Sequence, residues 1–437
     1  MGGGPSTTTA REESEHGGVS MGPVLDWVWP RCRRMSLASP RLDIGRDDGA
    51  SIQILGSGVS RRHASLERDG HLYILRDLGS TNGTWVNGSK AECVHVAPGA
   101  VVRIGDWVGV FGERSIEEMD DLGFSEVAPG VFGGAELAAI VRTLRRAALS
   151  RAPILMVGDT GTGKEGLARA VHHFSGRSGA FLAVNCAALP EQMAEAELFG
   201  YRRGAFTGAE RGSPGHFRAA HEGTLFLDEM PELSPSLQAK LLRAADTGEV
   251  LALGESKATL VDSRIVCASQ QSLRGLVEQH RLRRDLAARL GGLTLQLPPL
   301  RRRRADIAPL FNHFLKAQSG GHHPPVDARL VEALCLYDWP ENVRELKSVA
   351  EALLSLHGHE AQLRRRHLPP GIACDGDEPP RVASFAPPQP QLDLDRLKQE
   401  LQGNQGNVRA AAEALGVSRQ RIYRLLGPDL KGYRDGN

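Results

Sequence analysis

The chain has 437 residues, which is too long for a single ordinary core and predicts about three domains. Its hydrophobic fraction of 41% and charged fraction of 24% are typical of soluble globular proteins, and they exclude wholesale disorder and a fibrous architecture. A formal net charge of +1 neither requires nor excludes a nucleic-acid partner, because a small basic patch can disappear in the average.

Cysteine spacing and hydropathy indicate the compartment. The 6 cysteines contain no CxxC pair, so neither a zinc site nor a disulfide framework is expected. No apolar run approaches the roughly 18 residues that span a bilayer, and the first residues lack the apolar core of a secretion signal. We therefore expect a cytoplasmic protein without a membrane partner.

The first predicted domain follows a polar, Gly-rich tail at residues 1–22, which should be disordered. Over residues 23–115, short apolar runs alternate with turn signals such as Asn82-Gly83 and Asn87-Gly88. Strands at this spacing predict an all-β sandwich.

Three motifs of this region stand out: Gly45-Arg46, Ser60-Arg61-Arg62-His63 and the stretch from Asp77 to Thr84. Together they resemble the forkhead-associated (FHA) domain, which reads phosphothreonine peptides. Two arginines suit a phosphate dianion, and hydroxyl and amide side chains suit the peptide backbone. The resemblance implies a phosphopeptide site made by Arg46, Ser60, Arg61, Thr81 and Asn82, with His63 bracing the loop. A sandwich used only for protein contacts is the alternative.

The next domains are predicted from a change of pattern. After a linker at 116–135, apolar β runs alternate with helical segments over residues 136–300, which is typical of a parallel α/β sheet. Residues 301–370 lack strand signals and should form a helical lid. A Pro-rich linker at 371–390 leads to two short predicted helices within 391–431.

A phosphate-binding loop follows the apolar run that ends at Val157. Gly-rich backbone N–H groups, a helix N-terminus and a lysine are suited to phosphate oxygens. Glu165 stands where such loops usually carry Ser or Thr, so the pattern departs at its magnesium-contacting position. The predicted nucleotide-binding residues are Gly158, Asp159, Thr160, Gly161, Thr162, Gly163, Lys164 and Glu165.

A second acidic motif ends the apolar run Thr224-Leu225-Phe226-Leu227. Asp228 is expected to hold Mg²⁺ or its waters, and Glu229 to polarise the water that attacks the γ phosphate of ATP. The sequence therefore predicts an ATPase of the P-loop type.

The segment between these motifs contains Asn185-Cys186-Ala187-Ala188 and Glu197-Leu198-Phe199-Gly200. It resembles the central AAA+ ATPase domain of sigma-54-dependent transcription activators. In that family a loop touches the sigma-54 factor, and its tip corresponds here to Gly204, Ala205, Phe206, Thr207, Gly208 and Ala209.

The resemblance also implies roles for single residues. Asn185 matches the residue that restrains Glu229, Arg283 and Arg289 match arginine fingers offered to a neighbouring subunit, and Arg344 matches the sensor-two arginine. Fingers acting in trans imply a homo-oligomeric ring, a hexamer in this family. The sequence departs from the family at Ser269-Gln270, where Thr-Asn is usual, and at Glu341, where Gly is usual.

The C-terminal segment resembles a Fis-type helix-turn-helix, whose second helix lies in the major groove. The implied contacts with enhancer-like upstream DNA are Ser418, Arg419, Gln420, Arg421 and Arg424. The expected protein is a sigma-54-dependent activator that is regulated through a Ser/Thr kinase. Two alternatives remain, a phosphopeptide adaptor with a vestigial ATPase and a DNA-bound regulator that acts with another sigma factor.

Overall fold

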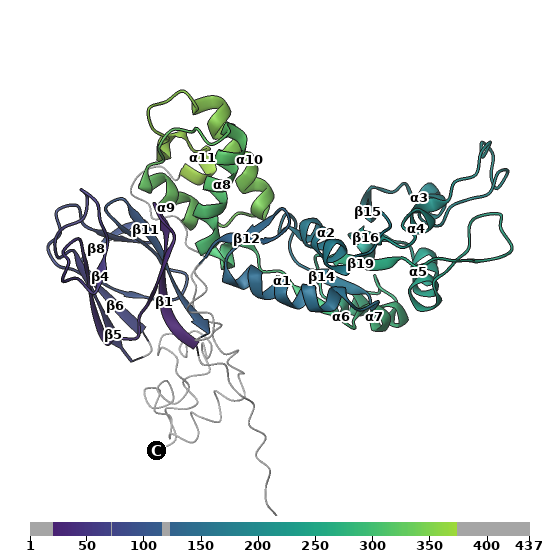
Figure 1. Ribbon diagram of the computed structural model, residues 1–437, viewed down its shortest axis with the longest axis horizontal. Coiled ribbons are helices and arrows are strands. Elements are labelled where there is room, and N and C mark those ends of the chain that lie inside the picture. The colour runs from purple at the N-terminus through teal and green to yellow at the C-terminus, as the bar shows by residue number, and fades with distance from the viewer. Residues whose placement is uncertain (1–20, 71, 116–122, 374–437) are drawn as a thin grey trace, which may run out of the picture. The chain divides into compact units, whose positions relative to one another are not determined.

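The computed structural model describes residues 21–70, 72–115 and 123–373 (Figure 1). The predicted helix-turn-helix at 391–431 and its DNA contacts lie outside these residues. Among the described helices, none is long and apolar enough to cross a membrane.

The N-terminal part is the predicted β-sandwich. One sheet has the strand order β2-β1-β11-β10-β7-β8 and the other β4-β3-β5-β6-β9. Only β3 and β4 pair in parallel among its described strand pairs. The strands are β1 (Met21–Trp29), β2 (Arg33–Ser36), β3 (Arg41–Gly45), β4 (Ile52–Gln53), β5 (Ala64–Asp69), β6 (Leu72–Asp77), β7 (Thr84–Val86), β8 (Ser89–Ala91), β9 (Cys93–Val96), β10 (Val101–Ile104) and β11 (Trp107–Ser115).

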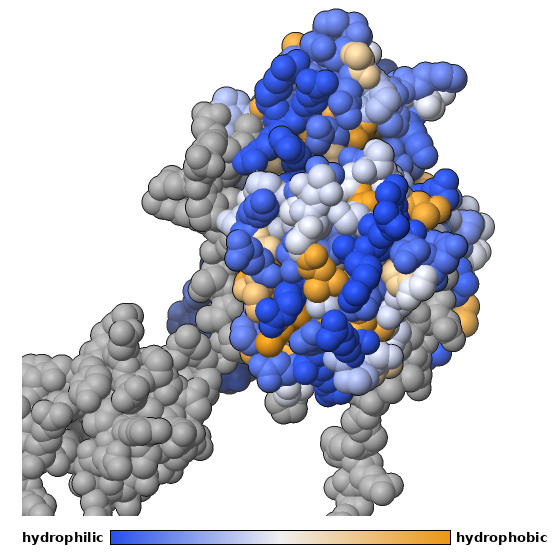
Figure 2. Space-filling view, turned by 90° about the vertical axis from the view of Figure 1, so that its left-hand side faces the viewer, coloured by the Kyte–Doolittle hydropathy of each residue, from blue (hydrophilic) through white to orange (hydrophobic). Residues whose placement is uncertain are grey.

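The two sheets enclose one apolar core. Trp27 and Trp107 meet edge to face in it, with ring centroids 5.6 Å apart, and Tyr73 packs against Phe111. The face seen in Figure 2 is mainly hydrophilic, with hydrophobic residues scattered between polar ones. Such single exposed apolar residues are ordinary on soluble domains.

A hairpin and a helix connect the sandwich to the α/β domain. The hairpin consists of β12 (Ser125–Ala128) and β13 (Val131–Gly133), and α1 (Ala135–Ala148) follows directly. Ala128 is buried with the inner face of α1 in the same apolar cluster as strand β14, so the hairpin belongs to the α/β domain.

The α/β domain is built on a five-stranded parallel sheet of order β15-β16-β19-β14-β20. The strands are β14 (Ile154–Val157), β15 (Phe181–Asn185), β16 (Thr224–Asp228), β19 (Arg264–Ser269) and β20 (Thr294–Gln296). The helices are α2 (Lys164–Ser175), α3 (Glu191–Phe199), α4 (Gly215–Ala219), α5 (Pro235–Thr247), α6 (Leu273–Glu278) and α7 (Arg284–Leu290), and β17 (Glu249–Val250) and β18 (Thr259–Leu260) form a separate hairpin.

The central strands read as continuous apolar runs because both faces of the sheet are covered. In β14, Leu155 and Val157 pack toward α3 to α7, whereas Ile154 and Met156 pack toward α1 and α2. The period of two in a strand sends alternate residues into these two cores. This is the doubly covered α/β sheet that the sequence predicts.

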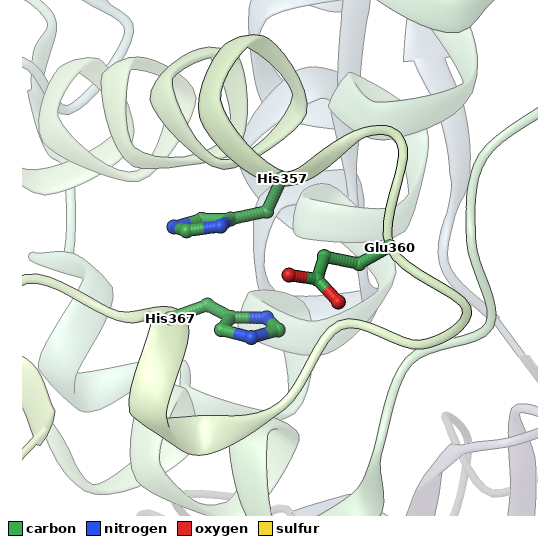
Figure 3. A group of neighbouring side chains, drawn as sticks. All are labelled: His357, Glu360 and His367. Carbon is green, nitrogen blue, oxygen red and sulfur yellow. The ribbon is translucent and has the colours of Figure 1, made fainter.

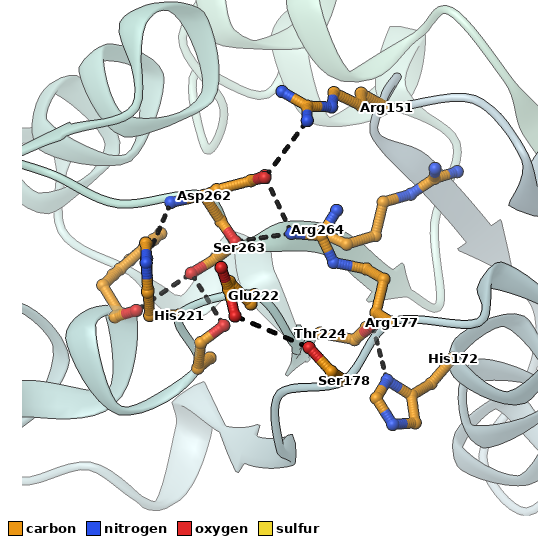
Figure 4. A network of polar contacts seen from close by, with 12 residues as sticks. Arg151, His172, Arg177, Ser178, His221, Glu222, Thr224, Asp262, Ser263 and Arg264 are labelled. Carbon is orange, nitrogen blue, oxygen red and sulfur yellow. Dashed lines mark hydrogen bonds and ion pairs between the residues drawn. The ribbon is translucent and has the colours of Figure 1, made fainter.

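A polar network ties the ends of β16 and β19 opposite the nucleotide site (Figure 4). Asp262 accepts from Arg177 at 2.8 Å and pairs with Arg151 at 3.3 Å. Arg264 is buried and donates to the carbonyls of Ala147 and Ala148 at the end of α1. Burial holds the pKa of Arg264 down at about 10. These contacts fix the amino ends of the strands, and so fix where their carboxyl ends lie.

The lid is helical, as predicted. Its helices are α8 (Ile307–Ser319), α9 (Ala328–Leu336), α10 (Asn342–His357) and α11 (Pro370–Ala373), with short 3-10 turns η4 (Leu300–Arg302), η5 (Arg304–Asp306) and η6 (Arg365–His367). Its core gathers around Trp339, which is fully buried and donates its indole N–H to the Leu334 carbonyl at 2.8 Å.

The side chain of Asn342 joins the lid to the phosphate loop. It is completely buried, its amide donates to the Thr160 carbonyl at 2.8 Å, and its oxygen accepts from the Leu300 N–H at 2.7 Å. Positive φ angles fall at Trp339 and Asn342, whereas Glu341 has φ of −97°. The turn therefore has no need of glycine at position 341, which removes the doubt raised by that departure.

We expect Asn342→Ala to loosen the joint between lid and phosphate loop. Each buried group left without its hydrogen bond costs about 1–3 kcal/mol. Hydrogen exchange of the full chain should show faster exchange at the Leu300 amide and in the phosphate loop, while Ser348→Ala on the exposed side of α10 leaves both unchanged. Unaltered exchange in Asn342→Ala would contradict this role.

Candidate functional site

A pocket lies where the carboxyl ends of β14, β15 and β16 face the lid. Parallel α/β sheets place their ligands at this edge. The pocket is lined by the phosphate loop, by the tip of the β12–β13 hairpin, and by α8 and α10 of the lid. Of the predicted residues, it is lined by Thr160, Gly161, Thr162, Gly163, Lys164, Glu165, Asn185, Asp228, Glu229 and Arg344.

The phosphate loop has the predicted strand-loop-helix geometry. Gly161 and Gly163 have positive φ angles of 73° and 103°, and α2 begins at Lys164. A Cβ on Gly161 would lie 2.1 Å from the Glu341 carbonyl oxygen, so glycine is required there for space as well as conformation. The Lys164 ammonium donates to the carbonyls of Gly158 and Asp159 at 2.8 and 3.2 Å.

Two loop residues make ion pairs. Glu165 pairs with Arg169 one helical turn later at 2.7 Å, and it also lines the pocket. Asp159 pairs with Arg301 of η4 at 3.1 Å, at the other end of the loop. Gly158 and Asp159 are absent from the lining of the pocket, although they belong to the same loop.

Asp228 and Glu229 stand at the end of β16. Asp228 is half-buried, and burial raises the pKa of its carboxyl, although Lys164 nearby acts in the opposite direction. Glu229 is held in the left-handed backbone region at φ of 50°, which is uncommon for a non-glycine residue. Its Oε1 accepts a hydrogen bond of 2.8 Å from the Gln270 side chain at the end of β19.

Asn185 lies beside these acids but is bonded elsewhere. It stands opposite Asp228 in the β15–β16 register, and its side-chain oxygen accepts from the Ala187 N–H at 3.0 Å. The residue bonded to Glu229 is therefore Gln270, one of the positions that depart from the family pattern. Ser269 instead donates to the Gln271 carbonyl.

Arg344 on the lid side of the pocket was predicted, but the apolar wall beside it was not. Val131, Phe132, Leu310, His313 and Phe314 form an apolar wall there. The His313 and Phe132 rings lie 3.8 Å apart, and burial lowers the pKa of His313, which favours its neutral form. A wall of this kind suits a flat heteroaromatic ring. Its residues come from two separate segments with no shared motif.

The basic run at 301–304, left unassigned from sequence, also contributes. Arg303 is 3% exposed, lines the pocket and donates to the Thr162 carbonyl at 3.2 Å. Clustered arginines usually form a solvated face, and only the fold shows that this one turns inward.

The two expected arginine fingers lie outside the pocket of their own chain. Arg283 is exposed and pairs with Asp285 at 2.7 Å, and Arg289 pairs with Asp246 at 2.8 Å. Neither residue lines the pocket that Lys164 and Glu229 share. Both side chains are exposed at the surface of the chain.

The segment 204–209 forms a tight turn at the tip of a loop between α3 and α4. The Gly204 N–H donates to the Ala209 carbonyl at 2.9 Å, and positive φ angles of 79° and 95° at Gly204 and Gly208 allow the chain to reverse. Phe206 is 42% exposed and packs on Tyr201 at 4.9 Å. An exposed aromatic residue held in this way is suited to protein contact.

The sandwich brings its five predicted residues to neighbouring loops. Ser60 Oγ accepts from the Thr81 N–H at 3.1 Å, and the Asn82 amide donates to the Gly58 carbonyl at 3.0 Å. The Arg46 N–H donates to the Ser60 carbonyl, so the loops that carry Arg46 and Arg61 are joined. Both arginine side chains are exposed.

Two buried groups brace these loops. His63 is fully buried and accepts from the Ser60 N–H while its other nitrogen lies 3.3 Å from the Gly83 carbonyl, and burial lowers its pKa. Asp77 accepts from Ser80 and Thr84; burial opposes its ionisation, but these hydrogen bonds outweigh it and hold its pKa below the usual range. The loops are therefore preorganised.

Among the described residues, His357, Glu360 and His367 are close enough to share a metal ion (Figure 3). The two rings are stacked 4.4 Å apart at 14°, so their in-plane lone pairs run side by side instead of converging. His367 Nδ1 already accepts from the Arg364 N–H at 3.2 Å. This geometry fits a packed turn and does not fit a metal site.

Three family models match successive parts of the chain. They are the FHA domain at residues 42–105, the sigma-54 interaction domain at 132–296 and the AAA+ ATPase lid domain at 301–385. The sigma-54 interaction domain match contains the phosphate loop, and the lid domain match contains the helices that face it. The pocket is lined by both regions.

Curated relatives include transcriptional regulators. The acetoin dehydrogenase operon transcriptional activator AcoR of Bacillus subtilis is 39% identical over 365 residues, which are 82% of this chain and 56% of that protein. Regulatory protein AtoC of Escherichia coli is 38% identical over 299 residues, 65% of this chain and 64% of that protein. The chain thus spans little more than half the length of these relatives.

Among solved structures, NtrX from Brucella abortus in complex with ATP is similar, with a TM-score of 0.51 and 29% identity over 70% of this chain and 69% of that one. The chain therefore combines regions similar to an FHA domain, a sigma-54 interaction domain and an AAA+ ATPase lid domain, in that order.

Proposed function

We propose that the chain is a sigma-54-dependent transcription activator that uses ATP hydrolysis in an oligomeric ring to remodel sigma-54 RNA polymerase. The observation that carries the proposal is the meeting of Lys164, Asp228 and Glu229 in one pocket, on the same domain as the exposed turn at 204–209. The matched sigma-54 interaction domain and the ATP complex of a similar structure support it.

In this proposal the phosphates of ATP lie on the N-terminus of α2. Backbone N–H groups of the loop and the Lys164 ammonium bind their oxygens, and the apolar wall around Phe132 and His313 receives the adenine. Asp228 is the carboxylate suited to Mg²⁺ or its waters, and Glu165 adds a second one where a hydroxyl is usual. The ion would neutralise charge on the phosphates.

Glu229 polarises the attacking water. The Gln270 amide holds one of its carboxylate oxygens, which leaves the other to accept a proton from water. Asn185 is in register with Asp228 and lines the same pocket. We propose that Asn185 is the residue that responds to the γ phosphate. Arg283 and Arg289 would complete the site of a neighbouring copy, and Arg344 would contact nucleotide from the lid.

In this proposal the N-terminal sandwich receives the regulatory signal, and the C-terminal segment binds the DNA site. The FHA-like sandwich binds phosphothreonine through Arg46, Ser60, Arg61, Thr81 and Asn82, which links the activator to a Ser/Thr kinase. The segment with Ser418, Arg419, Gln420, Arg421 and Arg424 binds enhancer-like DNA as a helix-turn-helix. A vestigial ATPase in an adaptor is disfavoured, because the three groups that bind phosphate, metal and water converge.

Replacing Glu229 by Gln should preserve ATP binding and lower hydrolysis by roughly 10²–10⁴-fold, because only the water-polarising carboxylate is lost. The matched control is Glu232→Gln, an exposed acid of the following 3-10 turn. Turnover is measured by phosphate release and binding with a fluorescent ATP analogue. Near-normal turnover in Glu229→Gln would refute the assignment.

Thr207→Ala should leave ATP turnover intact but abolish transcription from a sigma-54 promoter in a purified system, because the substitution changes only the exposed turn. Thr259→Ala, on the exposed strand β18, serves as control. Transcription that survives Thr207→Ala would mean that this turn is not the coupling element, and would favour the reading with another sigma factor.

Arg46→Ala should weaken phosphothreonine-peptide binding by at least about tenfold, because a charge-assisted hydrogen bond is worth about 1.5–3 kcal/mol. Arg76→Ala, an exposed arginine on β6 of the same sheet, should not change the affinity. Titration with phosphothreonine, phosphoserine and unmodified peptides checks this. Equal affinity for all three peptides would identify the sandwich as a protein-contact module.

A further inference from the structure

The outer face of the six-stranded sheet of the sandwich is buried at β1, β10 and β11. In β10, Val102 and Ile104 point into the sandwich core, whereas Val101 belongs to the apolar cluster of the lid. In β11, likewise, Phe111 lies in the sandwich core and Val110 in the apolar cluster of the lid. Both faces of these strands are therefore covered, one by the second sheet and one by the lid.

The covering element is mainly α9. This helix packs against β10 and β11, and α8 and η5 pack against β1. We call the set Val28, Val101, Arg103, Val108 and Val110 the docking face. All five residues are buried, and the most exposed side chain, that of Arg103, is 8% exposed.

A buried ion pair lies within the docking face. Arg103 Nε donates to Glu332 Oε2 of α9 at 2.6 Å, and their side chains are 8% and 6% exposed. The guanidinium also stacks over Trp85 at 4.6 Å. Removing one partner of such a pair leaves an uncompensated buried charge, which is strongly unfavourable.

Two consecutive arginines connect the docking face to the nucleotide pocket. Arg304 donates to the Gly99 carbonyl of the sandwich at 3.0 Å, and Arg303 donates to the Thr162 carbonyl of the phosphate loop at 3.2 Å. Both side chains are 3% exposed. A shift of the sandwich on the lid therefore acts on a segment that also contacts the phosphate loop.

The sandwich contacts both halves of the pocket. Its docking face packs on the lid, and Asp26 and Trp27 of the sandwich line one cavity with Gly134 and Ala135 at the start of α1. The pocket lies between these halves, so binding ATP and releasing products require them to move apart and together. A body that contacts both halves opposes that movement.

The docking face and the peptide loops are different surfaces of the sandwich. The hydrogen bonds described for the peptide loops stay within the sandwich: Ser60 accepts from the Arg46 and Thr81 N–H groups, and Asn82 donates to the Gly58 carbonyl. Arg46 and Arg61 remain exposed while the docking face is covered. A phosphopeptide can therefore reach its loops without first displacing the lid.

We propose that the docking face binds the lid of the same chain and, through the Arg103–Glu332 pair, restrains the lid and keeps ATP turnover low. The effect on turnover rests on the proposed ATPase function, whereas the docking itself does not. Release of the docking face is then the step by which input at the sandwich raises turnover.

The test uses Arg103→Met, Glu332→Leu and the double variant in the full chain. Each single variant leaves one buried charge without its partner, whereas the double variant leaves an apolar pair, which such sites often tolerate. We expect each single variant to raise ATP turnover at least about threefold and the double variant to return toward the unsubstituted chain. Arg76→Ala is the control and should change nothing.

Docking is measured separately by pulsed electron paramagnetic resonance. Spin labels are placed on exposed Cys93 of β9 and on Lys316→Cys of α8, with Cys32 and Cys374 replaced by Ser. The unsubstituted chain and the double variant should give one narrow distance distribution, and the single variants a broad one. Far-ultraviolet circular dichroism and hydrogen exchange of the single variants distinguish release from misfolding, because the cores of the sandwich and of the lid stay protected when only the docking face is released.

Three outcomes would overturn the proposal. They are a broad distribution in the unsubstituted chain, single variants that match Arg76→Ala, and release without a rise in turnover. If no chain hydrolyses ATP, the proposed ATPase function fails, and the distance distributions still decide whether the docking face binds the lid.

Discussion

The nucleotide pocket has two walls from different domains, and the buried amide of Asn342 joins them. It bonds one backbone group in the phosphate loop and another at the start of the lid. The closeness of the Glu341 carbonyl to Gly161 follows from the same joint. Because of this connection, the orientation of the lid and the shape of the phosphate loop cannot vary independently.

The other groups of the site depend on the sheet. Asn185, Asp228 and Gln270 lie at the carboxyl ends of three neighbouring parallel strands, so their spacing is set by strand register and not by local sequence. The contacts of buried Arg264 and partly buried Arg177 at the opposite strand ends keep that register in place. The chemistry at one edge of the sheet therefore relies on packing at the other.

Much of this could be predicted from local patterns. The turn signals and short apolar runs predict the sandwich, and the uninterrupted apolar runs predict a sheet covered on both faces. The phosphate loop and the acids at 228 and 229 are contiguous motifs, so their place in the pocket follows from the strand before each of them.

The remainder depends on contacts between distant segments. The apolar wall joins Phe132 to His313 across 181 positions (313 − 132), and no shared pattern marks the pair. The bond between Gln270 and Glu229 replaces one expected from Asn185, and it requires knowledge of side-chain reach across β16 and β19. A run of arginines predicts solvated side chains, but Arg303 and Arg304 are buried because each donates to a backbone carbonyl of a distant segment, Thr162 and Gly99 respectively.

The loop that carries Phe206 has a stiff base. Its two ends cross at Gly200 and Gly215, so closely that a Cβ on Gly215 would lie 2.2 Å from the Gly200 nitrogen. Tyr201 bridges both Ser213 and Leu253, and Phe199 and Phe217 stack 5.1 Å apart below the crossing. A displacement of α3 and α4 would therefore pass through the crossing to the exposed Phe206 ring instead of being absorbed in the base of the loop.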